Sequence, residues 1–148
     1  MKIVIQGLVL LLATTFSLSQ APRKLAMKQQ SECREDTGNL GIGLYVCNGG
    51  DCQISDRIKD GRITHRFTVE PLVREIDTKG PSAGKLQQND EIISVGGSLV
   101  TSFEGGYKLA NAGIGVPIEL RIRRNKREIK VQVVPGTGCN QPRLQVIQ

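Results

Sequence analysis

The sequence predicts a β-rich α+β fold, in which five to six mainly antiparallel strands form a partly open barrel or sandwich capped by two helices. One observation behind this prediction is the alternation of apolar and polar residues over 118–123 and again over 129–133. The other is the order of residue types over 73–97. There a strand-like run, a short helical turn, an acidic turn, a second strand-like run and two glycines follow one another. Both patterns favour short strands joined by tight turns.

The segment 73–97 predicts its elements in order. Gly80-Pro81 ends the first strand, because the proline ring fixes φ and proline has no amide hydrogen. Ala83 and Leu86 are three apart and can share one face of a single helical turn. The mostly β-branched run 92–95 favours another strand, and Gly96-Gly97 can form a two-residue hairpin turn.

A second helix is predicted over 102–112, with Ser102 as its N-cap and Gly113 as its C-cap. Gly105 and Gly106 lie inside it, and each costs about 1 kcal/mol relative to alanine. Paired glycines are therefore expected only where tertiary contacts hold the helix or where something approaches it closely. The other predicted elements are a strand over 24–28, a strand over 40–47, a long polar connection over 48–66, a strand region over 67–76 interrupted at Pro71, a hairpin over 118–134 and a tail over 136–148.

The first 19 residues predict a secretory signal peptide. Lys2 provides a charged start, residues 3–13 an apolar run and Ser17-Leu18-Ser19 a small-residue cleavage pattern. A membrane anchor is the alternative, but the apolar run is shorter than the ~20 residues that a span requires. The predicted organisation is a signal peptide over 1–19, one domain over 20–135 and a C-terminal tail over 136–148. The predicted location is extracellular or periplasmic.

Four cysteines behind a signal peptide predict two disulfides, with three possible pairings. Cys47 and Cys52 enclose turn-forming residues, so a local bridge between them is expected, which leaves Cys33 with Cys139. A zinc site is the alternative, but pairs of cysteines separated by two residues are absent and His65 is the single histidine. We therefore expect no metal, no cofactor and no catalytic residue.

The composition argues against a nucleic-acid-binding surface. The formal net charge is +6, but there are only three Phe, two Tyr and no Trp residues to stack on bases. The basic residues over 121–127 are expected to be a solvated face of the hairpin. A weak contact of the 121–130 hairpin with an anionic polymer or lipid is the alternative.

Several motifs, taken in order, give residues 22–135 a resemblance to a PDZ domain. Gly41-Ile42-Gly43-Leu44 is similar to the carboxylate-binding loop of that family, and the strand and turn over 45–50 follow it. The connection after that strand is longer than usual in the family. The other matching segments are Pro22-Arg23-Lys24-Leu25, Gly80-Pro81-Ser82-Ala83, the acidic turn and strand over 89–97, and Leu109-Ala110-Asn111-Ala112-Gly113.

The resemblance implies a non-enzymatic module that binds the C-terminal tail of a partner protein. Successive backbone N–H groups in a glycine-bearing loop can bind an anion, and a strand with a free edge over 44–47 can accept a peptide as an additional strand. The first residue of the second helix, Ser102 or Phe103, would select a ligand side chain. The expected peptide-binding residues are Gly41, Ile42, Gly43, Leu44, Tyr45, Val46, Ser102, Phe103, Gly106 and Leu109.

Two other functions remain open from the sequence. In the first, the groove is closed, the disulfides hold the module, and it interacts through another surface. In the second, the 121–130 hairpin binds anionic partners through its charge. An occupied groove would favour the first of these alternatives over peptide capture.

Overall fold

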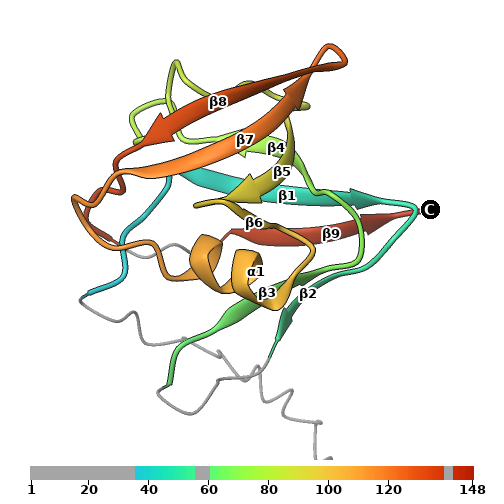
Figure 1. The fold of residues 1–148 in the computed structure, drawn as a ribbon, viewed down its shortest axis with the longest axis horizontal. Coiled ribbons are helices and arrows are strands. Elements are labelled where there is room, and N and C mark those ends of the chain that lie inside the picture. The colour runs from blue at the N-terminus through green and yellow to red at the C-terminus, as the bar shows by residue number, and fades with distance from the viewer. Residues whose placement is uncertain (1–35, 56–60, 139–141) are drawn as a thin grey trace, which may run out of the picture. The chain divides into compact units, whose positions relative to one another are not determined.

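A computed structural model describes residues 36–55, 61–138 and 142–148, all of which fall within one compact unit, Ser31–Gln148 (Figure 1). The signal peptide predicted over 1–19 and the strand predicted over 24–28 lie outside the described residues. None of the described helices is long and apolar enough to cross a membrane. The elements are β1 (Ile42–Asn48), β2 (Cys52–Ser55), β3 (Thr64–Phe67), β4 (Leu72–Ile76), β5 (Glu91–Val95), β6 (Ser98–Leu99), α1 (Phe103–Ala110), β7 (Ile118–Arg124), β8 (Arg127–Val133) and β9 (Arg143–Ile147).

The strands form a main sheet and a separate pair. The main sheet has the order β8-β7-β5-β4-β1-β9, with β6 paired to β5, and β2 pairs only with β3. Every pairing is antiparallel except that of β1 with β9, which is parallel. The β-rich class is confirmed. The sheets are open, however, and the expected barrel with two helical caps is not formed by the described residues.

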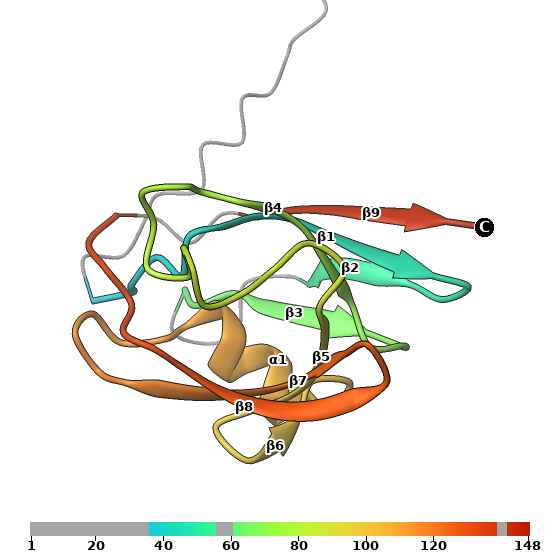
Figure 2. The same cartoon turned by 90° about the horizontal axis from the view of Figure 1, so that it is seen from above.

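One helix, α1, is present where two were expected. The first was predicted around Ala83 and Leu86, where the amide of Leu86 donates to the carbonyl of Ser82 over 3.0 Å. Gly84, inside this turn, has φ +71°, in the left-handed region, so the turn is not helical. In both views of the fold, α1 lies beside β3 (Figures 1 and 2).

The predicted turns form as expected. Gly96 and Gly97 have φ of +53° and +80° and join β5 to β6, with Val95 opposite Ser98. Asn125 and Lys126 also have positive φ and close the hairpin of β7 and β8. That hairpin pairs Ile118 with Val133, Leu120 with Val131 and Ile122 with Ile129, so one apolar face is continuous, as the alternation predicts.

The connection expected over 48–66 contains regular structure. Strand β2 and most of β3 lie within it. Strand β3 ends at Phe67 and β4 begins at Leu72, and Pro71 lies between the two strands. The predicted disulfide between Cys47 and Cys52 is present at the start of this connection, with the two Cα atoms 5.8 Å apart. The predicted pair of Cys33 with Cys139 lies outside the described residues.

A buried ion pair attaches the turn before β5 to the end of β7. Asp90 has a side chain only 1% exposed, and both of its oxygens accept hydrogen bonds of 2.7 Å from Arg124. Asp90 also accepts from the amide of Gln87, and Arg124 also donates to the carbonyl of Lys85. The hydrogen bonds from Arg124 to Asp90 raise the pKa of Arg124 above its ordinary value. Arg124, expected to be a solvated hairpin residue, therefore has a structural role.

We predict that Asp90→Asn lowers the free energy of unfolding by about 3 kcal/mol, because the change leaves Arg124 without its charged partner in a largely buried pair. Denaturant unfolding would measure this loss. Glu91→Gln is the matched control, since Glu91 and its partner Arg123 are both partly exposed and their pairing is screened by solvent. Equal losses for the two variants would contradict a structural role of the Asp90–Arg124 pair.

Candidate functional site

The glycine-bearing loop before β1 is held by neighbouring segments. Gly41 has φ +74°, and a Cβ at this position would lie 3.0 Å from Pro81 and from Gly80. The amide of Gly41 donates to the side-chain oxygen of Asn39 over 2.7 Å, and the buried hydroxyl of Ser82 donates to the carbonyl of Leu40 over 2.6 Å. The loop thus packs closely against residues 80–82, and glycine at 41 is required by both conformation and space.

The predicted site residues of β1 divide between the core and its margin. Ile42 and Val46 are buried, and Tyr45 is completely buried, with its ring against those of His65 and Phe67. Gly43 and Leu44 are partly exposed. A Cβ at Gly43 would lie 3.3 Å from a carboxylate oxygen of Glu75, which also forms an ion pair with Arg143 of β9.

Both edges of β1 are paired, which corrects the expectation that residues 44–47 leave an edge free. Strand β4 lies on one side and β9 on the other, with Leu44 opposite Arg143 and Asn48 opposite Ile147. The amide of Gly49 donates to the carbonyl of Ile147 over 3.1 Å and extends this pairing beyond the end of β1. The chain itself therefore supplies the additional strand that was expected from a partner.

The two residues at the start of α1 differ in how freely their side chains could contact a ligand. Ser102 is the N-cap and not a helical residue, as its hydroxyl oxygen accepts from the amide of Gly105 over 3.1 Å. Its hydroxyl also donates to the carbonyl of Leu99 over 2.6 Å. Phe103 is the first helical residue, is 55% exposed, and stacks on Tyr107 with ring centroids 6.2 Å apart. The C-cap is Asn111 and not the predicted Gly113.

The face of α1 that was expected to form a groove packs against β3. A Cβ at Gly106 would lie 1.9 Å from the carbonyl oxygen of His65, so glycine allows the two backbones to approach. The side chain of Asn111 donates to the carbonyl of Ile63 over 2.7 Å at the next turn. Leu109 is completely buried. The sequence correctly associated the paired glycines with a close approach, but the approaching groups are the backbone of β3 at Gly106 and the carbonyl of Leu99, in β6, at Gly105.

The structure also places functional candidates that the sequence did not single out. Strand β9 lies in the segment that was expected to be a tail. Leu144 and Val146 alternate there with polar residues, and this alternation was the sequence signal for a strand. His65, which falls in the long polar connection predicted over 48–66, is 1% exposed in β3. Burial lowers its pKa from 6.5 to about 4, and burial also raises the pKa of Tyr45.

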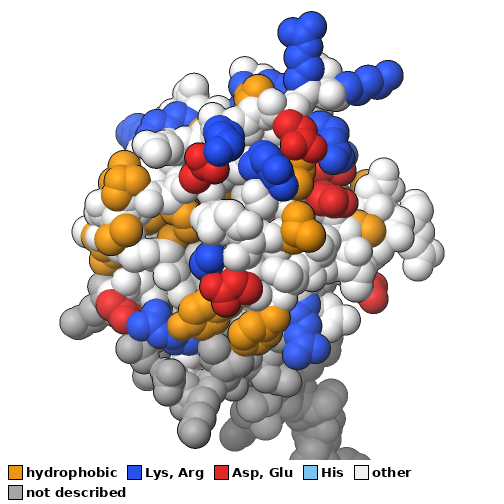
Figure 3. Space-filling view, in the orientation of Figure 1, with side chains coloured by type: hydrophobic (Ala, Val, Ile, Leu, Met, Phe, Trp, Pro, Cys, Tyr) orange, Lys and Arg blue, Asp and Glu red, His pale blue; other side chains and the backbone are white. Residues whose placement is uncertain are grey.

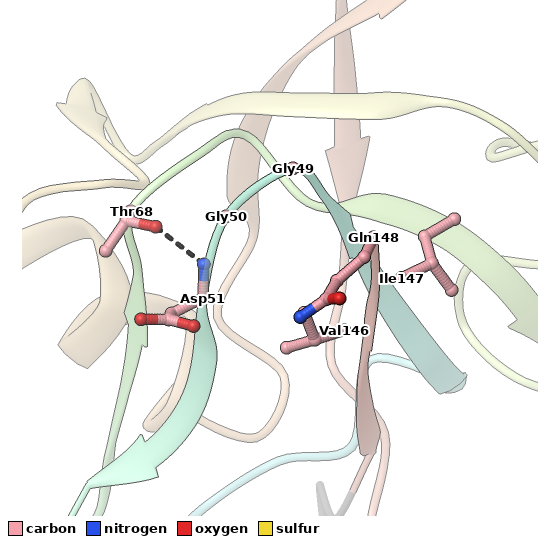
Figure 4. A pocket seen from close by; sticks show the side chains of 7 residues that line it. All are labelled: Gly49, Gly50, Asp51, Thr68, Val146, Ile147 and Gln148. Carbon is pink, nitrogen blue, oxygen red and sulfur yellow. Dashed lines mark hydrogen bonds between the residues drawn. The ribbon is translucent and has the colours of Figure 1, made fainter.

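Two hollows border β9. One has a volume of about 400 Å³ and is lined by the turn over 49–51, by Thr68 and by the last three residues of the chain (Figure 4). Within it, the amide of Asp51 donates to the hydroxyl of Thr68 over 2.7 Å. The other, of about 330 Å³, lies between β4, β1 and β9, over Leu44 and Val46. Both are shallow features along a strand that is itself at the edge of the sheet.

The basic hairpin is largely compensated by acidic neighbours. Acidic and basic side chains alternate over the β7–β8 end of the molecule (Figure 3). Glu128 lies within 4 Å of both Arg121 and Arg123, and Lys130 lies 3.2 Å from Glu119. These pairs place acidic side chains among the basic ones without changing the net charge of the hairpin. Among the described residues, no group of three or more His, Cys, Asp or Glu could hold a metal ion.

Comparisons with known proteins give partial similarity. No protein-family model matches the chain. The chain is 31% identical over 58 residues to the pro-apoptotic serine protease NMA111 of Meyerozyma guilliermondii, covering 39% of this chain and 6% of that protein. It is 30% identical over 115 residues to the 1-deoxy-D-xylulose-5-phosphate synthase of Vibrio cholerae serotype O1, covering 67% and 18%. The solved structure of the HtrA-type protease AlgWS227A with tripeptide matches at 16% identity and a TM-score of 0.44, covering 76% of this chain and 35% of that one.

The chain spans less than a fifth of either curated relative. The two relatives carry unrelated enzyme names, so neither activity extends to this chain from these matches alone. Matches to serine proteases of the NMA111 type come from three organisms, over 58 to 66 residues, and matches to the synthase come from three strains of Vibrio cholerae serotype O1.

We predict that Gly106→Ala destabilises the fold by about 1–3 kcal/mol, because the new methyl group would collide with the backbone of β3. Helix propensity alone would give the opposite sign, since alanine is favoured over glycine by about 1 kcal/mol. Denaturant unfolding would measure the change, with Glu104→Ala as an exposed control in the same helix. A gain in stability for Gly106→Ala would show that α1 does not pack on β3.

Proposed function

We propose that this chain is a non-enzymatic, PDZ-like protein-interaction module that works by strand addition at β1, and that β9 occupies this edge until a partner peptide replaces it. The pairing of β9 with β1 is the observation that carries the proposal. It places a strand along the very edge that the sequence assigned to a ligand. The same edge can accept a peptide once its N–H and C=O groups are released.

The proposed ligand is the C-terminal tail of a partner protein. Its terminal carboxylate would lie at the loop of Gly41 to Leu44, and its strand would lie beside Tyr45 and Val46. Phe103, exposed at the start of α1, would contact a ligand side chain, and Gly106 and Leu109 would join the site once β3 moves. The support is the order of motifs along the chain and the partial similarity to serine proteases of the NMA111 type.

The environment of His65 supports a non-enzymatic role. The imidazole is buried, and its two nitrogens contact no partner among the described residues. A general base must reach the proton that it removes, directly or through one water. The side chain of His65 faces Tyr45 and Phe67 instead of a cavity open to substrate.

A secreted location is part of the proposal. The disulfide of Cys47 with Cys52 is compatible with an extracellular or periplasmic space, where thiols are oxidised. The short bridge links the end of β1 to the start of β2, and a loop of this size stabilises the folded state by about 2 kcal/mol.

A second candidate function is an interaction through another surface, with the groove permanently closed. The packing of β3 on α1 favours it, because two separate elements then cover the proposed site. Its contact surface would include the exposed apolar side chains Leu99, Phe103, Ile114, Val116 and Val134. Binding that persists when β9 is locked on β1 would distinguish this function from peptide exchange.

The experiment is to weaken β9 without shortening the chain. Because Ile147 accepts a hydrogen bond from Gly49 and backbone groups alternate in direction along a strand, the N–H groups of Ile147 and Gln145 face β1. We predict that Gln145→Pro removes one of these bonds and increases the affinity of C-terminal peptides about tenfold. The measurement is a screen of a C-terminal peptide library on the oxidised protein, followed by titration of the best ligand.

Val146→Pro is the matched control, since the N–H of residue 146 points away from β1 and its loss leaves the pairing intact. Amidated copies of the same peptides test recognition of the carboxylate. Chemical shift changes over residues 42–46 would locate the binding. Equal affinity for the two proline variants, or shifts confined to other residues, would reject exchange at β1.

A further inference from the structure

His65 is a buried imidazole without a hydrogen-bond partner. It is 1% exposed, and neither Nδ1 nor Nε2 has a partner among the described residues. Its ring packs against those of Tyr45 and Phe67, with centroids 6.4 Å and 6.0 Å away, and those two rings also contact each other at 6.0 Å. The hydroxyl of Tyr45 is also buried without a partner in the described part of the chain. An added proton would therefore place a charge where nothing nearby compensates it.

The backbone of His65 makes a close contact between β3 and α1. Its carbonyl oxygen occupies the space that a Cβ at Gly106 would need. The hydroxyl of Thr64 donates to the same carbonyl over 3.3 Å, and Ile63 accepts from Asn111 of the helix. A change in the position of the His65 side chain thus acts directly on the contact between β3 and α1.

The hairpin formed by β2 and β3 is a sheet of its own. It pairs with neither edge of the main sheet among the described strands. It is joined to β1 through the disulfide of Cys47 with Cys52, so release of the hairpin leaves its base attached. Its backbone lies beside α1 and β9, and the rings of His65 and Phe67 pack against Tyr45 of β1. A local opening is therefore possible without loss of the sheet.

The charged groups of the surrounding elements do not face His65. On α1, Glu104 and Lys108 form an ion pair 3.3 Å long on the outer side, where Lys108 also donates to Gly96 and Ser98. On β3 itself, Arg66 is exposed, since neighbouring residues of a strand point to opposite faces. On β1, burial raises the pKa of Tyr45, whose hydroxyl stays neutral. On β2, the register places Ile54 opposite His65.

We propose that the β2–β3 hairpin is an acid-released cover over α1, and that a proton on His65 favours the state in which the hairpin has left the helix. Opening gives the imidazolium access to water, which the closed state denies it. Release of the hairpin would expose Gly106 and Leu109 to a peptide, and this consequence rests on the proposed function. The release itself is measurable without any peptide.

The sign and range of the effect follow from burial. Because burial lowers the pKa of His65 from 6.5 to about 4 in the closed state, the closed state binds fewer protons than the open one. Its stabilisation is complete above pH 6.5 and is lost as the pH falls toward about 4. Between about pH 7.5 and about pH 5, the equilibrium constant for opening rises by up to about 30-fold.

The test is amide hydrogen exchange by NMR on the oxidised full chain at about pH 7.5 and about pH 5, corrected for intrinsic exchange rates. The expected result is a loss of protection for β2, β3 and the facing amides of α1, with the β7–β8 hairpin unchanged. Equal loss over β7 and β8 would mean global unfolding and would overturn the proposal. So would protection of β3 that does not depend on pH.

Variants without a titrating ring complete the test. His65→Phe keeps an aromatic side chain against Tyr45 and Phe67, and His65→Gln is a second neutral replacement in case the larger ring is not accommodated. Both are expected to abolish the pH dependence of protection in β3. Retention of that dependence would overturn the role of His65, as would an NMR titration that places the pKa of His65 near its ordinary value. Neither outcome affects the peptide experiment on β9, so the two proposals fail separately.

Discussion

The close contact between the backbones of α1 and β3 is the constraint on which the arrangement of the site depends. The absence of a side chain at Gly106 allows the carbonyl of His65 to approach, and this approach holds the β2–β3 hairpin against the helix. The hairpin then buries His65 with Tyr45 and Phe67 and covers the wall that includes Leu109. A substitution that kept the helix but filled this space would move the hairpin and expose the wall.

The two coverings of the site differ in kind. Strand β9 covers β1 through backbone pairing and through the ion pair of Arg143 with Glu75, both near the surface. The β2–β3 hairpin covers α1 through apolar packing and a buried, unsatisfied imidazole. Exposed pairing responds to competing strands and to salt, whereas the buried imidazole responds to protons. One module can in this way have two independent means of opening.

The elements with local signals were predictable from the sequence, and those defined by distant partners were not. The alternation of Ile118, Leu120 and Ile122 and the positive-φ residues Gly96 and Gly97 specify their hairpins within a few residues. Ser102 likewise identified the start of α1. The five residues of β9 carry a weak pattern and become a strand only because β1, about a hundred residues earlier, offers an edge. The closure of the site follows from such long-range contacts, and so did the burial of His65.

The position of β9 sets a requirement on any partner that would replace it. A strand tethered to its own domain has an effective concentration of about millimolar. A free peptide at micromolar concentration is therefore about a thousandfold less concentrated at the edge of β1 than β9 is. Backbone hydrogen bonds cannot recover this difference, because β9 already makes them. The partner must therefore gain from its side chains, in contacts with Phe103, or from a terminal carboxylate at the loop of Gly41. The side chains of β9 are weak competitors in this respect, since Arg143, Gln145 and Val146 are exposed and only Leu144 packs against the core.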